Sequence, residues 1–359
     1  MYIEANMEEI ERQKFNRELN ISWVDENLPK ADNAIILKHY FSSLVVYGIV
    51  LLFIWFNPFF SKMLAYPLKV TFNYFYLYYM FGAPIIYICF RPKSLWRSHN
   101  LEIMRYFHRI LTHRPKLKTM SAEEIKNELD FYLPKYYEKQ SLILIFIKVF
   151  FGTQMLSIAY SNIHSCIISS TAVYNDIKAC FSQILPSDFI QYKTFILDYR
   201  EFIYSQCIII LYTIDVSIFT FGYFTELSIF KNKIRTVETT PAGLFFCLAC
   251  YAPFFNATNS FLGWNHNDHA AAFSDPNSPV TWIFRICALF FLVIYVSASA
   301  ALGTKGSNLT NRGTVSRFPY SVVRHPAYIT KVMFWFLTTV PLFIAVSYTH
   351  LRAHETGRN

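Results

Sequence analysis

Long apolar runs alternate with shorter polar stretches along most of the 359-residue chain. A membrane-spanning helix needs about 20 predominantly apolar residues, and seven runs reach or approach that length. The fifth run is short and contains Pro253, which predicts a tilted, kinked or re-entrant segment. The pattern therefore predicts an all-α polytopic membrane protein with about seven transmembrane helices. The seven runs are residues 41–60, 70–90, 141–163, 203–226, 241–256, 279–302 and 326–345.

Proline marks the predicted start of three of these helices. Thr240-Pro241, Ser278-Pro279 and His325-Pro326 each place a cap residue before a proline at the first helical position. Proline suits that position because its missing N–H would have no partner there. Residues 121–124 read Ser-Ala-Glu-Glu and form a capping box, which predicts a short additional helix that ends before Pro134.

Composition and charge fit a membrane protein whose N-terminus is cytoplasmic. The chain is 53% hydrophobic and 19% aromatic, which exceeds the usual values for a soluble domain. Its net charge of +9 is concentrated in alternate loops, as the positive-inside rule requires, rather than in a patch for nucleic acid. The residues up to Lys38 and the loops 91–140, 227–241 and 303–325 carry 5, 11, 3 and 4 Lys or Arg, against 2, 3 and 0 in the loops 58–69, 164–202 and 257–278.

The cytoplasmic loop 91–140 begins with a basic and aromatic segment. Residues 91–118 hold eight Lys or Arg against one acid, Glu102. Such a segment is either attracted to anionic lipid headgroups or is simply a positive-inside loop, and the sequence leaves both interpretations open. The spacing of His99, His108 and His113 does not match the clustered histidines of desaturases, which predicts solvated histidines.

Ionisable residues inside apolar runs are costly and are candidates for function. Lys148 and Asp215 lie roughly 10 and 16 Å from the cytoplasmic ends of their runs, at about 1.5 Å per residue. Two interpretations stay open: a structural ion pair between them, or the polar wall of a substrate cavity. His266, Asp268 and His269 cluster in a loop that is predicted to face outward, so no metal site is predicted.

Residues 308–331 carry the strongest candidate chemistry. Arg324 and His325 lie four and three residues before Tyr328, so these side chains meet on one side of the predicted helix start. A helix start with exposed N–H groups and a nearby arginine binds anions. The rings of Tyr320 and Tyr328 can face a cation. S-adenosylmethionine combines the two charges, because it carries a carboxylate and a sulfonium.

The residues at 319–328 read Pro-Tyr-x-x-Val-Arg-His-Pro-x-Tyr, a pattern that resembles the signature of the isoprenylcysteine carboxyl methyltransferase and phospholipid methyltransferase family. Residues 308–313, and less specifically 235–241 and 250–256, are similar to segments of bacterial members. The chain departs from the family at Phe318, where glycine is usual. The resemblance implies a bacterial inner-membrane enzyme with residues 308–331 on the cytoplasmic side.

The resemblance also implies the site and the reaction. Arg324 and His325 would be catalytic, and Tyr320, His325, Pro326 and Tyr328 would contact S-adenosylmethionine. A methyl group would pass by direct displacement to a lipophilic acceptor from the bilayer, which is a carboxylate, a thiol or a lipid amine. A prenylated cysteine is the substrate for which the family is named. No metal and no nucleic acid are expected.

Two alternatives remain. A sterol-reductase-like membrane enzyme would use NADPH, with a 2′-phosphate site among the basic residues of 303–325. A transporter would use Lys148, Asp215 and Arg285 inside the spans. It would also show internal repeats, and the sequence has none that we detect.

The chain divides into four predicted regions. Residues 1–40 form a cytoplasmic tail, 41–240 an accessory membrane region, and 241–345 an incomplete methyltransferase-like membrane region. Residues 346–359 resemble one reading frame of a transposase-type sequencing adapter, which predicts a non-native tail after a truncation near Ala345. In the family, a later cytoplasmic segment with Glu and Arg completes the cofactor pocket, so the chain as it stands is expected to keep a partial, inactive site.

Overall fold

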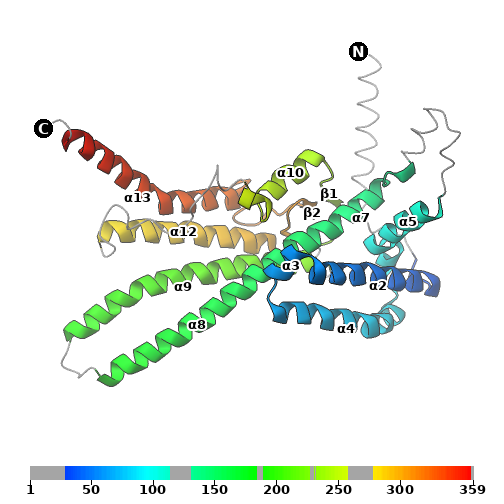
Figure 1. The fold of residues 1–359 in the computed structure, drawn as a ribbon, viewed down its shortest axis with the longest axis horizontal. Helices are drawn as coiled ribbons and strands as arrows, with labels where there is room; N and C mark the ends of the chain where they lie inside the picture. The colour runs from blue at the N-terminus through cyan, green and yellow to red at the C-terminus, as the bar shows by residue number, and fades with distance from the viewer. Residues whose placement is uncertain are drawn as a thin grey trace, which may run out of the picture. The chain divides into compact units, whose positions relative to one another are not determined.

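The computed structural model describes residues 29–113, 131–183, 189–226, 230, 232–257 and 278–356, which are mainly helical (Figure 1). The chain forms two compact units. Unit 1 comprises Met1–Ser157, Glu226–Phe255 and Ser307–Gly313, and unit 2 comprises Ile158–Thr225, Asn256–Gly306 and Thr314–Asn359. The predicted capping box at 121–124 and the outer-loop residues His266, Asp268 and His269 lie outside the described residues.

Within the part of the chain that the structure describes, five helical stretches are long and apolar enough to cross a membrane, so the helical membrane character of the prediction is confirmed. Each corresponds to one of the seven predicted runs. The run 70–90 is helical within α4 (Tyr66–Phe90) but is not among the five. The run 241–256 forms α10 (Pro241–Ala249), whose nine residues are too short for a span of about 30 Å. The five stretches are Asn33–Phe56, Tyr136–Ala172, Tyr199–Phe224, Pro279–Lys305 and Pro326–Ser347.

Unit 1 is built around α2 (Asn33–Phe56), which packs against α4 and α5 (His99–Thr112) (Figure 1). The short helix α3 (Pro58–Met63) follows α2, and the 3-10 turn η1 (Lys93–Arg97) precedes α5. α5 also packs against α7 (Tyr136–Ile147), which continues through the π-helical turn η3 (Lys148–Gly152) into α8 (Thr153–Gln183). The buried core beside α2 consists of Ala31, Ile35, Ile36, Leu95 and Leu101.

Side-chain caps fix several helix starts in unit 1. Asp32 accepts a hydrogen bond from the Ile35 N–H at 2.7 Å before α2, and Ser98 accepts one from the Leu101 N–H at 3.1 Å before α5. Thr240 accepts one from the Gly243 N–H at 3.1 Å, which confirms the predicted start of α10 at Pro241. These helix starts are therefore local properties of the sequence.

In unit 2, α12 (Pro279–Leu302) packs against α9 (Phe189–Phe224) and α13 (Pro326–Thr356) (Figure 1). Ser278 caps α12 by accepting a hydrogen bond from the Thr281 N–H at 3.2 Å, as predicted. α9 closely approaches the 3-10 turn η5 (Gly303–Lys305), because a Cβ on Gly222 would lie 2.7 Å from the Gly306 carbonyl oxygen. The buried core of this unit consists of Ala288, Leu292, Tyr295, Val296 and Phe334.

Candidate functional site

The predicted cofactor residues gather at the start of α13. The helix begins at Pro326 as predicted, and the His325 carbonyl accepts a hydrogen bond from the Ile329 N–H at 3.3 Å. Pro326 is buried, whereas Arg324 and His325 are exposed. The ring centroids of His325 and Tyr328 lie 6.1 Å apart, with the ring planes at 73°. The three-residue spacing therefore brings these two rings together, as the sequence predicted.

A tight turn before α13 positions Tyr320. The buried Pro319 anchors it, and its carbonyl accepts hydrogen bonds from the N–H groups of Val322 at 3.1 Å and Val323 at 3.2 Å. Phe318, at the position where the family has glycine, is 67% exposed, so this turn forms without a glycine. Burial, and then the nearby Tyr328 phenol, raise the pKa of Tyr320. The two tyrosines on which the cation argument rests therefore lie on either side of the helix start at Pro326 in the sequence.

A polar cluster lies deeper in unit 2. The Tyr295 hydroxyl donates a hydrogen bond to Asp215 Oδ2 at 2.8 Å, and both side chains are buried. Lys331 on α13 places its Nζ 5.3 Å from the ring centroid of Tyr295 and 5.1 Å from that of Trp335. Of the two interpretations left open by the sequence, an ion pair between Lys148 and Asp215 is wrong, because Lys148 pairs with Glu226. Tyr295 carries no charge at neutral pH, so an inspection of charged residues alone could not have found it as the partner of Asp215.

Unit 1 contains a second ionic cluster, which the sequence did not predict. Lys148 Nζ lies 2.5 Å from Glu226 Oε1, at the residue where the π-helical turn η3 begins. The Ile234 N–H also donates to Glu226 Oε2, at 3.5 Å. On α5, His99 Nδ1 lies 3.1 Å from the hydroxyl oxygen of Ser141 on α7. The sequence signals for this cluster are Lys148, which was singled out as an ionisable residue within an apolar run, and Glu226 at the end of another run, but nothing in the sequence links the two.

The charges of this cluster stabilise one another. Burial alone would raise the pKa of Glu226, but the charges of Lys148, His99 and Arg312 outweigh it and lower that pKa to about 2. Burial lowers the pKa of His99 to about 4, with Glu226 opposing the shift and Lys148 adding to it. At neutral pH the cluster therefore holds a carboxylate beside a lysine and a neutral imidazole. Its partners lie within unit 1, which is typical of a structural ion pair.

Residues 308–331, taken as one site from the sequence, are divided between the two units. Residues up to Gly313 belong to unit 1, and those from Thr314 belong to unit 2. Arg312 is 4% exposed and donates a hydrogen bond to the Asn232 carbonyl at 3.0 Å. Gly313 has a φ of +90°, and a Cβ there would lie 3.1 Å from the Arg235 guanidinium. The first part of the stretch is therefore a structural element of unit 1.

The three other segments on which the predicted resemblance rests, residues 235–241, 250–256 and 308–313, meet in unit 1, apart from Asn256 at the end of the second. β1 (Thr236–Val237) pairs antiparallel with β2 (Thr310–Asn311), and Thr236 lies opposite Asn311. The Glu238 N–H extends this pairing by donating to the Leu309 carbonyl at 2.8 Å. From the third segment, the Tyr251 hydroxyl accepts a hydrogen bond from the Asn308 amide at 2.7 Å. Residues 235–241, 250–256 and 308–313, which are distant in the sequence, are thus in contact in the structure.

Comparison with known proteins adds no family assignment: no family model, curated protein or solved structure matches this chain. Within the described residues, no group of three or more His, Cys, Asp or Glu could hold a metal ion. The candidate chemistry therefore rests on the residues at the start of α13.

Proposed function

We propose that this protein is an integral membrane methyltransferase of the isoprenylcysteine carboxyl methyltransferase type, which uses S-adenosylmethionine and a lipophilic acceptor. The proposal includes seven membrane spans, a cytoplasmic N-terminus, a bacterial inner-membrane location and a site on the cytoplasmic side. One observation carries it: the rings of His325 and Tyr328 lie together at the exposed start of α13, where Arg324 adjoins His325 and Tyr320 lies in the turn that precedes the helix.

The residue types at this helix start are suited to both charged groups of S-adenosylmethionine, the carboxylate and the sulfonium. The N–H groups of the first turn of α13 and the exposed Arg324 guanidinium suit a carboxylate. The aromatic faces of Tyr320 and Tyr328 suit a sulfonium. Pro326 contributes a buried ring that fixes the direction of the helix start without presenting an N–H of its own.

When bound, S-adenosylmethionine supplies an electrophilic methyl group, whose transfer to a carboxylate forms a C–O bond, breaks the S–C bond and leaves a neutral thioether. A carboxylate acceptor has no proton to lose, so the contribution of the chain is alignment and exclusion of water. Arg324 holds the carboxylate end of the cofactor. If the acceptor is a thiol or an amine, His325 is placed to accept its proton.

NADPH chemistry is the less favoured alternative. A 2′-phosphate site would draw on the basic residues of 303–325, and Arg312 among them is buried and donates to the Asn232 carbonyl. The exposed Arg324 is also one of these basic residues, but it adjoins His325, whose ring centroid lies 6.1 Å from that of Tyr328, and a cation next to aromatic rings suits a ligand that carries both charges. The transporter alternative predicts internal repeats, and we detect none in the sequence.

The test is a methyl-transfer assay on the protein expressed from its complete gene and reconstituted into lipid vesicles. With methyl-labelled S-adenosylmethionine and a membrane lipid extract, the wild-type protein should transfer label into the organic phase. His325→Gln should reduce that transfer by at least about tenfold, because one cofactor contact is removed. His164→Gln, an exposed histidine on α8, is the matched control and should leave transfer unchanged. Absence of label transfer together with NADPH oxidation would favour the reductase instead.

A further inference from the structure

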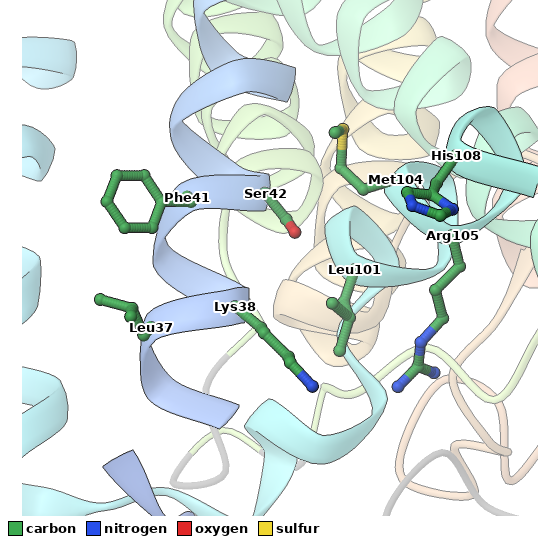
Figure 2. Close-up of a pocket in the computed structure, with 8 residues that line it drawn as sticks. All are labelled: Leu37, Lys38, Phe41, Ser42, Leu101, Met104, Arg105 and His108. Atoms are coloured by element: carbon green, nitrogen blue, oxygen red, sulfur yellow. The ribbon is translucent and has the colours of Figure 1, made fainter. Parts of the chain in front are cut away.

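A groove runs between the first turns of α2 and helix α5 in unit 1 (Figure 2). Its cavity volume of about 440 Å³ lies within the range of roughly 300–1,000 Å³ that is usual for small-molecule sites. All the residues that line this groove belong to unit 1, whereas the start of α13 belongs to unit 2. It is lined by Leu37, Lys38, Phe41 and Ser42 from α2 and by Leu101, Met104, Arg105 and His108 from α5.

The spacing of the lining residues explains why the groove forms. On α5 they recur at intervals of three and four, and on α2 at intervals of one and four, so each helix presents one continuous stripe. Leu101 and Ser42 are buried and form the floor. Leu37 and Phe41 are each 56% exposed on α2, a helix that is long and apolar enough to cross a membrane. The groove therefore opens onto a surface suited to acyl chains.

The remaining lining residues give the groove a cationic end. Lys38, Arg105 and His108 are exposed. Arg105 pairs with Glu102, but its side chain stays 50% exposed. Figure 2 shows the Lys38 and Arg105 side chains extending in the same direction, toward the end of α2 that holds Leu37, with Leu101 between them in the view. An apolar groove that ends in two long cationic side chains matches the polarity of an anionic lipid.

We propose that this groove binds one anionic phospholipid molecule. The headgroup phosphate lies between Lys38 and Arg105, where two positive charges face it. The glycerol and first methylenes fill the groove over Leu101 and Met104, and the acyl chains continue along Leu37 and Phe41 into the bilayer. The lipid joins α2 to the amphipathic α5 and holds α5 at the membrane surface. This binding does not depend on the proposed methyltransferase activity.

The test measures lipid binding by the full chain in detergent with native mass spectrometry. Phosphatidylglycerol and phosphatidylcholine with identical acyl chains are the two probes. Wild-type protein should retain one phosphatidylglycerol in preference to phosphatidylcholine. Lys38→Gln combined with Arg105→Gln should lower phosphatidylglycerol affinity by roughly tenfold, because both phosphate partners lose their charge. The matched control combines Lys30→Gln with Lys139→Gln, which removes the same charge at exposed positions outside the groove, and should change affinity by less than about twofold.

Three results would overturn the proposal. Equal loss in the groove and control variants would mean general attraction of a basic protein for anionic lipid. Unchanged binding in the groove variant would mean that another segment or a partner protein covers the groove. Displacement of the lipid by soluble glycerol phosphate would mean that the groove binds phosphate without contacting the acyl chains. Phe41→Ser adds an independent arm, since it should weaken long-chain phosphatidylglycerol more than a short-chain analogue if the acyl contact is real.

Discussion

Unit 1 and unit 2 each contain one group that includes residues marked by the sequence as candidates for function, and the two groups differ in their exposure. At the start of α13 in unit 2, Arg324, His325 and Tyr328 are exposed. In unit 1, Lys148 and Glu226 have side chains only 24% and 21% exposed and pair with each other. The side chains of the first group face outward, whereas the two charges of the second group pair with each other. The difference separates residues that are available to a ligand from residues that hold the fold together.

The comparison corrects the usual expectation for ionisable residues in membrane helices. Lys148 is the kind of intramembrane charge that is first suspected of function. Its pairing with Glu226 gives it a structural role, whereas the exposed His-Pro helix start carries the candidate chemistry. Variants in the two groups should accordingly fail in different ways: loss of stability for the buried pair, and loss of ligand binding for the helix start.

The largest expected effect is on the buried pair. Glu226→Ala leaves Lys148 without its carboxylate, and because the pair is partly buried we expect the free energy of unfolding to fall by about 2–3 kcal/mol. Glu102→Ala is the comparison, because it leaves the charge of Arg105, whose side chain is 50% exposed, in contact with solvent. That variant should lose less than about 1 kcal/mol. Chemical denaturation of both variants in detergent measures the difference, and equal losses would contradict the distinction.

A smaller effect should follow the titration of His99. Its pKa is lowered to about 4 in the folded protein from 6.5, so the unfolded chain takes up a proton first as the pH falls. The contribution of neutral His99 to the free energy of unfolding is therefore fully present above pH 6.5. It declines toward pH 4, by at most about 1.4 kcal/mol per pH unit. The lowered pKa of Glu226 adds a further loss only below its ordinary value of 4.5.

The interval between pH 6.5 and pH 4.5 thus isolates His99 from Glu226. Unfolding midpoints across this interval should fall in the wild-type protein and fall less in His99→Gln. His164→Gln, which removes a histidine outside the His99–Glu226 cluster, is the matched control and should follow the wild-type curve. Parallel curves for the wild type and His99→Gln would show that the imidazole does not contribute to the acid sensitivity.

Sequence patterns predicted the local features of this fold well. The helix starts at Pro241, Pro279 and Pro326 depend on neighbouring residues, and the structure has all three. The approximate positions of five apolar helices likewise follow from composition, although the stretch Tyr136–Ala172 is longer than the predicted run 141–163. The grouping of His325 with Tyr328 was also predictable, because it follows from helical periodicity alone.

Contacts between distant residues could not be predicted in the same way. Glu226 is 78 residues from Lys148, and Tyr295 is 80 residues from Asp215. No period or spacing in the sequence encodes such separations, so the sequence left two interpretations open for Lys148 and Asp215, an ion pair between them or the polar wall of a cavity. The division of residues 308–331 between two units is equally non-local, because it depends on the pairing of β1 with β2.

The smallest effect on stability is expected at the start of α13. Arg324→Gln and Tyr328→Ala change exposed side chains, so the free energy of unfolding should move by less than about 0.5 kcal/mol in each. Thermal unfolding in the same detergent checks this. A loss of unfolding free energy comparable with that of Glu226→Ala would mean that these residues stabilise the fold and are not primarily available to a ligand.

The most direct measurement is the affinity for S-adenosylmethionine, by isothermal titration of the protein expressed from its complete gene. The wild type should bind, and His325→Ala and Tyr328→Ala should each weaken binding by at least about tenfold, or about 1.4 kcal/mol, without loss of stability. Glu201→Ala should bind as the wild type does. Absence of binding by the wild type, or unchanged affinity in His325→Ala, would contradict the assignment of the start of α13 as the cofactor site.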